Sequence, residues 1–343
     1  MKKDIKSFTL DGLKNEMISI GAQAFRAKQV YTWLHGRKVS NFSEMTDLSL
    51  GLREQLEANY YINAFKIKRK LVSKIDGTVK YLFELSDSEC IESVVMRYNH
   101  GNTICISSQV GCRMGCKFCA STIGGKCRDL TPSEMLDQIN TAEQDLGESI
   151  SNVVMMGIGE PLDNFDNVMD FLTILSSKEG YNKSLRHLSL STCGVCDKID
   201  MLADKKLQLT LSISLHAPND EIRNNIMPVN HKWSVKELID TCKRYIKKTG
   251  RRISFEYTLI HGVNDTDECA RQLAKLLEGM ICHVNLIPVN EVSETSFVKS
   301  EKARILSFSN ILTSRGITTT VRRKLGADIE AACGQLRRND AND

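Results

Sequence analysis

Apolar residues recur at three- and four-residue spacing through the first part of the chain, in the ranges 6–18, 24–35 and 48–59. This period places them on one face of a helix, so we expect three amphipathic helices. From residue 65 the pattern becomes strand-like, and the runs 78–85 and 90–96 are separated by a short polar stretch. Two such runs around a polar turn predict a β-hairpin.

Beyond residue 100, short apolar runs alternate with amphipathic helical stretches. This alternation is typical of βα units around a parallel sheet. Pro132, Ser234 and Thr266 stand where helices would begin, since proline suits the first helical turn and hydroxyl residues suit the N-cap. About six units are present rather than the eight of a complete barrel. We therefore expect an α/β fold with a partial (β/α)6 barrel, whose strands lie near 103–108, 152–156, 187–191, 208–214, 253–259, 283–287 and 318–322.

The same patterns divide the chain into three parts. Residues 1–90 are predicted to form a small, mainly helical accessory domain, residues 91–322 the core barrel and residues 323–343 a C-terminal tail. No low-complexity linker separates these parts. Because a flexible linker is what lets domains swing, the accessory domain is expected to pack on the barrel.

The composition is that of a globular protein, with 41% hydrophobic residues among 343. There is no apolar signal region at Met1 and no apolar run approaching 18 residues, so no membrane segment is expected. In a reducing compartment, crowded cysteines indicate metal binding or catalysis rather than disulfides. The twelve cysteines therefore fit a cytoplasmic protein with a metal or catalytic site.

Positive charge is concentrated near the N-terminus. The net charge is only +4, but residues 1–90 hold 15 Lys and Arg against 11 Asp and Glu. The run Lys66–Lys70 follows Tyr60, Tyr61 and Phe65, and cations mixed with aromatic rings suit a nucleic-acid surface. A solvated strand or helix face has the same pattern, so both interpretations stay open.

Three cysteines stand close together in one short stretch. Cys112, Cys116 and Cys119 are spaced by four and three residues and follow an apolar run, 103–110, that is predicted to be a strand. Thiolates at this spacing suit an iron–sulfur cluster. Three ligands on a 4Fe–4S cluster leave one iron open to substrate, whereas Cys127, eight residues further on, would complete a closed zinc or electron-transfer site.

The spacing CxxxCxxC, with Phe118 before the last cysteine, resembles the signature of the radical S-adenosylmethionine (radical SAM) superfamily. The resemblance implies that the open iron binds S-adenosylmethionine (SAM), which is cleaved to a 5′-deoxyadenosyl radical. In parallel α/β folds ligands gather beyond the carboxyl ends of the strands. For residues 157–161 an ordinary tight turn is the alternative. The candidates for holding SAM are Gly159, Glu160, Ser191, Ser214, Leu215, His216 and Asn290.

Longer motifs narrow the resemblance. Together they are similar to the RlmN/Cfr family of radical SAM RNA methyltransferases, over nearly the whole chain. The resemblance implies methylation at carbon 2 of adenine 2503 in 23S rRNA and of adenine 37 in tRNA. Methylation at carbon 8 of the same rRNA adenine is the alternative within the family. The motifs are QVGC at 109–112, GIGEPL at 157–162, SLHAPN at 214–219, HVNLIP at 283–288 and GADIEAACGQL at 326–336.

The resemblance also implies roles for three further residues. One SAM methylates Cys333; a second is cleaved, and its radical removes a hydrogen from that methyl group, which then adds to the adenine. Glu92 would accept the ring proton. Cys105, on the same predicted strand as Cys112, would release the product by forming a disulfide with Cys333. The alternative for Cys105 is a small buried strand residue without a catalytic role, and the alternative for Glu92 is an exposed strand carboxylate.

The partners implied by the family are 23S rRNA, tRNA and a flavodoxin-type electron donor, with two SAM consumed per turnover. Arg322–Lys324 and Arg337–Arg338 are further candidate phosphate contacts, and the target adenine is expected to leave its stack. An alternative from another class is a four-cysteine metal module that binds RNA without catalysis. It would make Cys127 a metal ligand and Cys333 dispensable.

Overall fold

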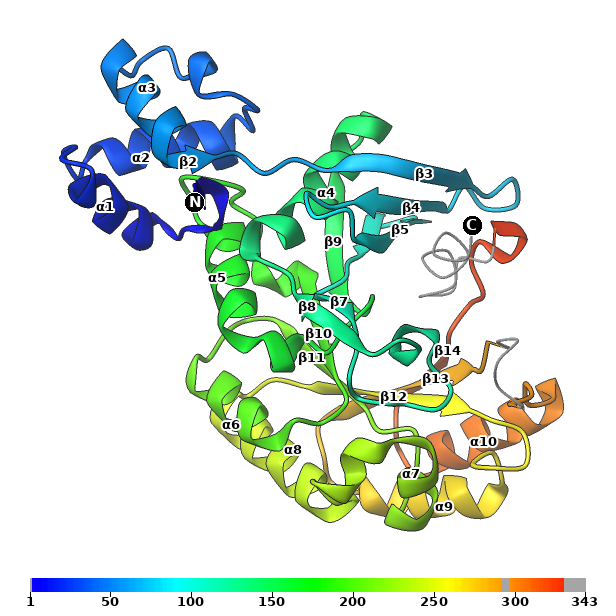
Figure 1. Ribbon diagram of the computed structural model, residues 1–343. Helices are drawn as coiled ribbons and strands as arrows, with labels where there is room; N and C mark the ends of the chain where they lie inside the picture. The colour runs from blue at the N-terminus through cyan, green and yellow to red at the C-terminus, as the bar shows by residue number, and fades with distance from the viewer. Residues whose placement is uncertain (1, 291–296, 330–343) are drawn as a thin grey trace.

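The computed structural model describes residues 2–290 and 297–329. Figure 1 shows a helical lobe at the N-terminus beside a long curved sheet with helices packed against it. Three predicted site residues, Cys333, Arg337 and Arg338, lie outside the described residues. Within the described part of the chain, no helix is long and apolar enough to cross a membrane.

The three N-terminal helices predicted from the spacing are confirmed. Helix α1 (Leu10–Ser19) begins after Thr9, whose hydroxyl accepts a hydrogen bond from the backbone N–H of Gly12 and so satisfies one of the free donors at the helix start. The other elements of the lobe are β1 (Lys3–Asp4), η1 (Ile5–Ser7), α2 (Arg26–Tyr31), the π-helical turn η2 (Thr32–Gly36), η3 (Phe42–Glu44), α3 (Leu50–Asn59) and β2 (Tyr60–Tyr61).

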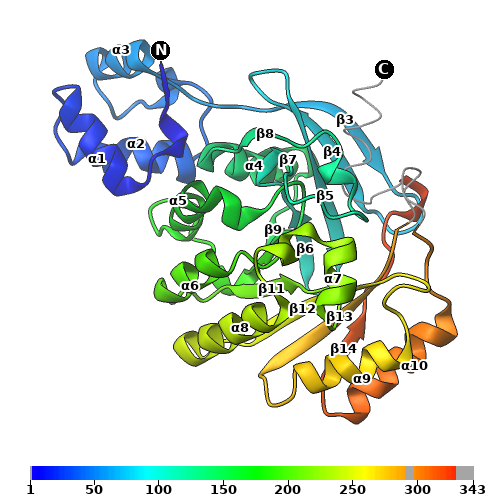
Figure 2. The same ribbon diagram turned by 60° about the horizontal axis from the view of Figure 1, so that its bottom comes forward.

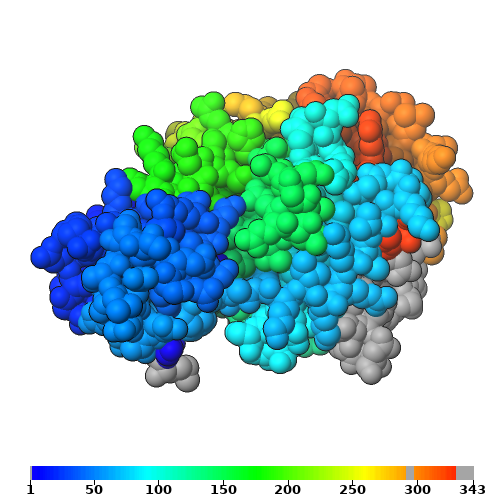
Figure 3. Space-filling view, turned by 90° about the horizontal axis from the view of Figure 1, so that it is seen from above, coloured from blue at the N-terminus to red at the C-terminus, as the bar shows by residue number. Residues whose placement is uncertain are grey.

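The N-terminal lobe is fixed to the barrel by a buried ion pair. Lys6 and Asp137, a residue of α4 (Pro132–Leu146), are both almost fully buried and form a salt bridge. Asn63 completes the group, because its carbonyl accepts from Lys6 at 3.1 Å and its amide donates to Asp137 at 2.9 Å. Figure 3 shows the lobe lying directly against the central part of the molecule. The prediction that the accessory region packs on the barrel is confirmed.

Ten strands form one mixed sheet with β14 and β3 at its edges. Seven of them, from β6 to β14 in the sheet order, are parallel, and β5, β4 and β3 continue the sheet in antiparallel fashion. The strands are β3 (Lys66–Val72), β4 (Val79–Glu84), β5 (Cys90–Tyr98), β6 (Gly101–Cys105), β9 (Ile150–Met155), β10 (Leu188–Thr192), β11 (Thr210–Ser214), β12 (Ile253–Leu259), β13 (Cys282–Pro288) and β14 (Thr319–Val321).

Helical crossovers join the parallel strands, and Figure 2 shows α5, α6, α8 and α9 on the outside of the curved sheet. Six crossovers for seven parallel strands confirm the partial (β/α)6 barrel. Pro132, Ser234 and Thr266 stand at helix starts as predicted, and the Ser234 and Thr266 hydroxyls accept backbone hydrogen bonds there. The helices of the barrel are α4, α5 (Phe165–Ser176), α6 (Cys196–Asp204), α7 (Asp220–Ile226), α8 (Val235–Thr249), α9 (Asp267–Leu276) and α10 (Lys302–Ser314). The short helical turns are η4 (Ala120–Thr122), η5 (Pro161–Asn164), η6 (Leu185–His187), η7 (Pro228–His231) and η8 (Ala327–Ile329).

The hairpin predicted for 78–96 is confirmed as the antiparallel pair β4 and β5. Because β3 and β4 extend the barrel sheet, part of the region assigned by sequence to the accessory domain is continuous with the barrel through hydrogen bonds. The domain division at residue 90 stays a prediction.

The expected single strand from residue 103 to 110 is wrong. Strand β6 ends at Cys105, and β7 (Gln109–Gly111) pairs with β8 (Lys126–Asp129) in a separate two-stranded sheet. Between them, Gln138 bonds both the N–H and the carbonyl of Ser107, at 2.7 and 2.9 Å. The buried Gln138 side chain forms the backbone hydrogen bonds that a neighbouring strand would otherwise form. The chain leaves the sheet at this point, so Cys105 and Cys112 are not on the same strand.

Candidate active site

The cysteine loop is a compact turn between β7 and β8. The N–H of Cys112 donates to the carbonyl of Gly125 at 3.1 Å, and the N–H of Cys119 donates to the carbonyl of Cys116 at 3.1 Å. Thr122 closes the turn, because its hydroxyl donates to the carbonyls of Cys116 and Cys119. At its entrance, Gly111 has a φ of 76°, and a Cβ there would lie 1.9 Å from the Gly125 oxygen. Only glycine fits this position.

The three thiols lie close enough to influence one another. Burial raises the pKa of Cys112 to about 12 and the pKa of Cys116 further, and the charge of Cys119 adds to both increases. A thiolate in this loop therefore needs a compensating positive charge, which bound iron would supply. Within the described residues no three His, Cys, Asp or Glu side chains converge on one metal ion. Cluster cysteines bind different irons, so the three thiols fit a 4Fe–4S cluster.

Cys127 is not gathered with the other three cysteines. It is exposed on β8, and its thiol lies 3.6 Å from the Glu89 carboxylate. A closed four-cysteine site therefore receives no support from the arrangement of these residues.

The turn after β9 carries Gly159 and Glu160. Gly159 has a φ of 106°, and a Cβ there would lie 2.6 Å from the Cβ of Gln109, so only glycine fits at this position. Glu160 is buried, and its carboxylate accepts hydrogen bonds from the backbone N–H groups of Cys193 at 2.7 Å and Leu162 at 3.0 Å. Burial raises the pKa of Glu160, against the lowering effect of these two hydrogen bonds. The carboxylate thus joins the turns after β9 and β10.

Polar residues at the ends of β10 and β11 also meet. The hydroxyls of Ser191 and Ser214 lie 3.4 Å apart. Next to them His216 is buried, accepts from the Thr258 N–H at 2.9 Å and packs edge-on against Phe118 of the cysteine loop, with ring centroids 5.0 Å apart. Burial lowers the pKa of His216 to about 3, so its ring is neutral at physiological pH. The SAM candidates of these strands therefore adjoin the cysteine loop.

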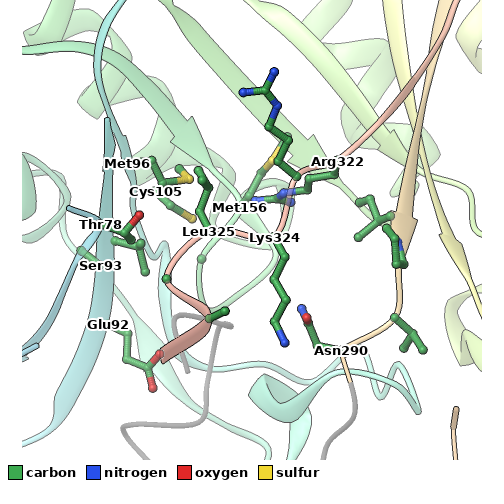
Figure 4. Close-up of a pocket in the computed structure, with 18 of the residues that line it drawn as sticks. Thr78, Glu92, Ser93, Met96, Cys105, Met156, Asn290, Arg322, Lys324 and Leu325 are labelled. Atoms are coloured by element: carbon green, nitrogen blue, oxygen red, sulfur yellow. The ribbon is translucent and has the colours of Figure 1, made fainter. Parts of the chain in front are cut away.

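A second group of candidates lines a cavity of about 570 Å³ between β5, β6 and the segment after β14. Figure 4 shows Glu92 and Cys105 on one side and Asn290, Arg322 and Lys324 on the other. Burial raises the pKa of Cys105 to about 11, although the charge of Arg322 opposes this increase. Cys105 is therefore a protonated thiol in the free protein. The predicted cofactor residue Asn290 lies with this group.

Glu92 is not the exposed carboxylate of the alternative interpretation. Its side chain is 2% exposed, and Oε2 lies 3.1 Å from Nζ of Lys80, which is 1% exposed. Both faces of β5 are buried around Glu92, from Cys90 to Ser93, so the alternation that would place a carboxylate in solvent does not apply. A buried ion pair with an oxygen at the cavity wall provides a fixed carboxylate.

The segment after β14 is held across the cavity by the turn between β3 and β4. Asp328 accepts from the Ser73 hydroxyl at 2.6 Å and from the Lys74 N–H at 2.8 Å, and Asp76 accepts from the Gly326 N–H at 2.8 Å. The Ser73 hydrogen bond lowers the pKa of Asp328. For Asp76, burial acts in the opposite direction, but hydrogen bonds from Gly326 and Thr78 outweigh it and lower the pKa to about 2. We call these contacts the tail latch.

Sequence reasoning missed two buried residues near the site. Arg223 on α7 is fully buried behind the cysteine loop, and Glu256 on β12 is 4% exposed and accepts from Asn285 at 2.8 Å. Glu256, inside the strand predicted at 253–259, was the available signal, because charged residues are rarely buried without a reason. Arg223 lies outside every predicted element, so no signal for it was available in the sequence.

Two protein-family models match parts of the chain. Residues 3–62 match the ribosomal RNA large subunit methyltransferase N-terminal domain, and residues 106–276 match the radical SAM superfamily. The second match covers the cysteine loop and most of the barrel, so a 4Fe–4S cluster and SAM are the cofactors.

Full-length relatives agree with these matches. Proteins described as probable dual-specificity RNA methyltransferase RlmN from Alkaliphilus oremlandii (strain OhILAs) and Clostridium novyi (strain NT) are 54% and 51% identical over 337 residues, covering 98% of each chain. A crystal structure of a radical SAM methyltransferase from Sphaerobacter thermophilus superposes with a TM-score of 0.91 at 40% identity, over 97% of this chain and 98% of that one. The chain therefore belongs to the RlmN family of radical SAM RNA methyltransferases.

Proposed function

We propose that this protein methylates carbon 2 of adenine 2503 in 23S rRNA and of adenine 37 in tRNA. One observation carries the proposal: Glu92 and Cys105 line a single cavity, and the segment that leads to Cys333 crosses it. A thiol, a carboxylate and a second cysteine are the groups that a methyl-carrying cysteine mechanism needs. The family membership and the dual-specificity names of the relatives support the substrate.

The cofactors would be held on the cysteine-loop side of the barrel. Cys112, Cys116 and Cys119 would bind the 4Fe–4S cluster, and Gly159, Glu160, Ser191 and the 214–216 turn would hold SAM. Bound there, they supply a methyl group and a 5′-deoxyadenosyl radical. The neutral ring of His216 and the hydroxyls of Ser191 and Ser214 are polar groups without net charge. They therefore suit hydrogen bonding to the sugar and amine of SAM.

Three residues of this chain would then carry the methyl group and release the product. The sulfur of Cys333 accepts a methyl group and, after hydrogen removal, its carbon bonds to the adenine. Glu92, fixed by Lys80, takes the ring proton, and the unpaired electron left on the adduct would return to the bound 4Fe–4S cluster, so a closed-shell thioether remains. Cys105 loses its proton and attacks the Cys333 sulfur, so a sulfur–sulfur bond forms as the carbon–sulfur bond breaks. The electron pair of the broken bond stays with the carbon, which takes up a proton to become the methyl group.

Cations near the cavity support an RNA substrate. Arg322, Arg323 and Lys324 line it together with Lys299, and strand β3 presents exposed Lys and Arg at the sheet edge. Such cations neutralise phosphates, and a base turned out of its stack would enter the cavity. The proposal includes a cytoplasmic location and a flavodoxin-type electron donor.

The test is mass spectrometry of nucleosides after anaerobic incubation of the reconstituted protein with SAM, a reductant and unmodified 23S rRNA or tRNA. The proposal predicts 2-methyladenosine in both RNAs. Finding only 8-methyladenosine would assign the chain to carbon-8 chemistry. Finding neither product with an intact cluster would favour a non-catalytic RNA-binding protein. Cys333→Ala is the matched variant, since it should load the cluster normally and yield no methylated adenosine.

A further inference from the structure

Arg223 is a buried cation that the proposed mechanism does not use. Its side chain lies on α7, and the residue is 0% exposed. The guanidinium donates to the carbonyls of Leu215 at 3.0 Å, Cys193 at 2.6 Å and Ser214 at 3.2 Å, and to Oδ1 of Asn230 at 2.9 Å. These bonds occupy most of its donors and fix its orientation.

None of these partners is a carboxylate, and Arg223 forms no ion pair within the described part of the chain. The acid on the same helix, Asp220, is engaged by the amide of Asn230 at 2.9 Å and the N–H of Val235 at 2.7 Å. Burying an unpaired cation costs several kcal/mol or more. Asp220 acts on Arg223 electrostatically but makes no direct hydrogen bond to it. A fully buried guanidinium bound directly only by neutral groups therefore suits a further negative charge nearby.

The cysteine loop supplies that charge when it carries its cluster. The loop is joined to α7 by a hydrogen bond from the N–H of Lys117 to the carbonyl of Ile226, at 3.0 Å, one turn beyond Arg223. The thiols of Cys116 and Cys193 are close enough to act electrostatically on Arg223. A cluster with three thiolate ligands becomes more negative when it accepts an electron, and hydrogen bonds and nearby charge set its reduction potential.

We propose that Arg223 is a positioning residue whose fixed positive charge lies beside the 4Fe–4S cluster and makes the cluster easier to reduce. The charge acts through the low-dielectric interior rather than by contact with SAM, because most of its N–H groups are already bound to protein carbonyls. Reduction of the cluster precedes every radical step. The inference rests on the cluster ligands and is independent of which adenine carbon is methylated.

The test is an anaerobic redox titration of the reconstituted holoenzyme followed by electron paramagnetic resonance, without RNA. Arg223→Gln keeps a polar side chain but removes the charge, and it should shift the reduction equilibrium at least about tenfold toward the oxidised cluster, which is about 59 mV for one electron. Arg223→Lys keeps the charge and should stay within about threefold of the unaltered enzyme. Arg244→Gln, which removes the charge of an exposed arginine of α8, should leave the potential unchanged.

If Arg223 acted only through its hydrogen bonds, the two variants would behave alike. Neither lysine nor glutamine can form the forked hydrogen bonds of the guanidinium. Equal shifts in Arg223→Lys and Arg223→Gln, or no shift in Arg223→Gln, would overturn the proposal. Iron content is measured first. If Arg223→Gln loads no cluster, the lysine variant decides alone: a potential near that of the unaltered enzyme supports the role of charge, and a tenfold shift contradicts it. Because no RNA is present, failure of the methylation assay would not affect this result.

Discussion

The two sides of the active site are built in different ways. The cluster side is one short loop, residues 112–119, with backbone hydrogen bonds to its own next turn and to α7. The cavity that holds Glu92 and Cys105 is assembled from β5, β6 and residues 322–327, which come from distant parts of the chain and are joined by the tail latch. Substitutions on the first side should therefore affect cluster assembly, and substitutions on the second should affect later steps with the cluster intact.

The largest effect is expected from removing a cluster ligand. Cys112→Ala should lose the cluster and all SAM cleavage, because two thiolates do not retain it in a loop this short. Cys127→Ala, on the exposed face of β8, should keep full iron content and activity. Iron analysis and cleavage of SAM to 5′-deoxyadenosine measure both variants. Loss of the cluster in Cys127→Ala would instead support a closed four-cysteine site.

On the cavity side, Glu92→Gln should lower RNA methylation by about 10²- to 10⁴-fold, because the amide accepts no proton. Cleavage of SAM should continue. The substitution breaks the buried pair with Lys80, so a loss of stability of about 3–5 kcal/mol is also expected. Lys80→Met is the matched control, since it breaks the same pair but keeps the carboxylate. If both variants lose methylation equally, the buried pair as a whole, rather than the carboxylate alone, explains the effect.

The tail latch should have a smaller effect on the same side. Asp328→Asn replaces the oxygen that accepts from the Lys74 N–H with an amide donor, so the segment before Cys333 is held less firmly. We expect methylation to fall on the order of tenfold, as for a modest loss of positioning, with unchanged SAM cleavage. Glu268→Gln, an exposed carboxylate on α9, serves as the control. Unchanged methylation in Asp328→Asn would show that the latch has no part in the reaction.

The smallest effect concerns pH and the cluster side. The pKa of His216 is about 3 in the folded protein and about 6.5 in the unfolded protein. Below pH 6.5 the unfolded protein binds a proton at this ring that the folded protein does not bind. The free energy of unfolding therefore falls as the pH drops from 6.5 toward 3. Between pH 7 and pH 5 this fall should amount to about 2 kcal/mol. His216→Asn suits the positive φ of 56° and does not titrate. Urea unfolding at both pH values should show a weaker pH dependence in this variant.

Much of the fold follows from local patterns. The order of strands and helices came from apolar periodicity, and the starts of α8 and α9 came from Ser234 and Thr266. The cysteine loop was equally evident, because its ligands are adjacent in the sequence. These features depend on residues within one or two turns of each other.

The features that escaped prediction depend on contacts between distant residues. Strand β6 stops at Cys105 because Gln138, 31 residues away from Ser107, bonds the backbone there. Glu92 is paired in the interior with Lys80, its diagonal neighbour on strand β4. The tail latch joins residues that are 250 or more positions apart. Arg223 is buried because α7 packs behind the cysteine loop, which no local pattern predicts. No periodicity encodes such pairings.

The most direct test of the division between the two sides uses Cys105→Ala. Anaerobic incubation of this variant with SAM, a reductant and RNA, followed by mass spectrometry of the protein, should find RNA joined covalently to the peptide that contains Cys333. The cluster should be intact, and little free methylated adenosine should form, since no second thiol is present to break the thioether. Free product at the rate of the unaltered enzyme, without an adduct, would contradict the account.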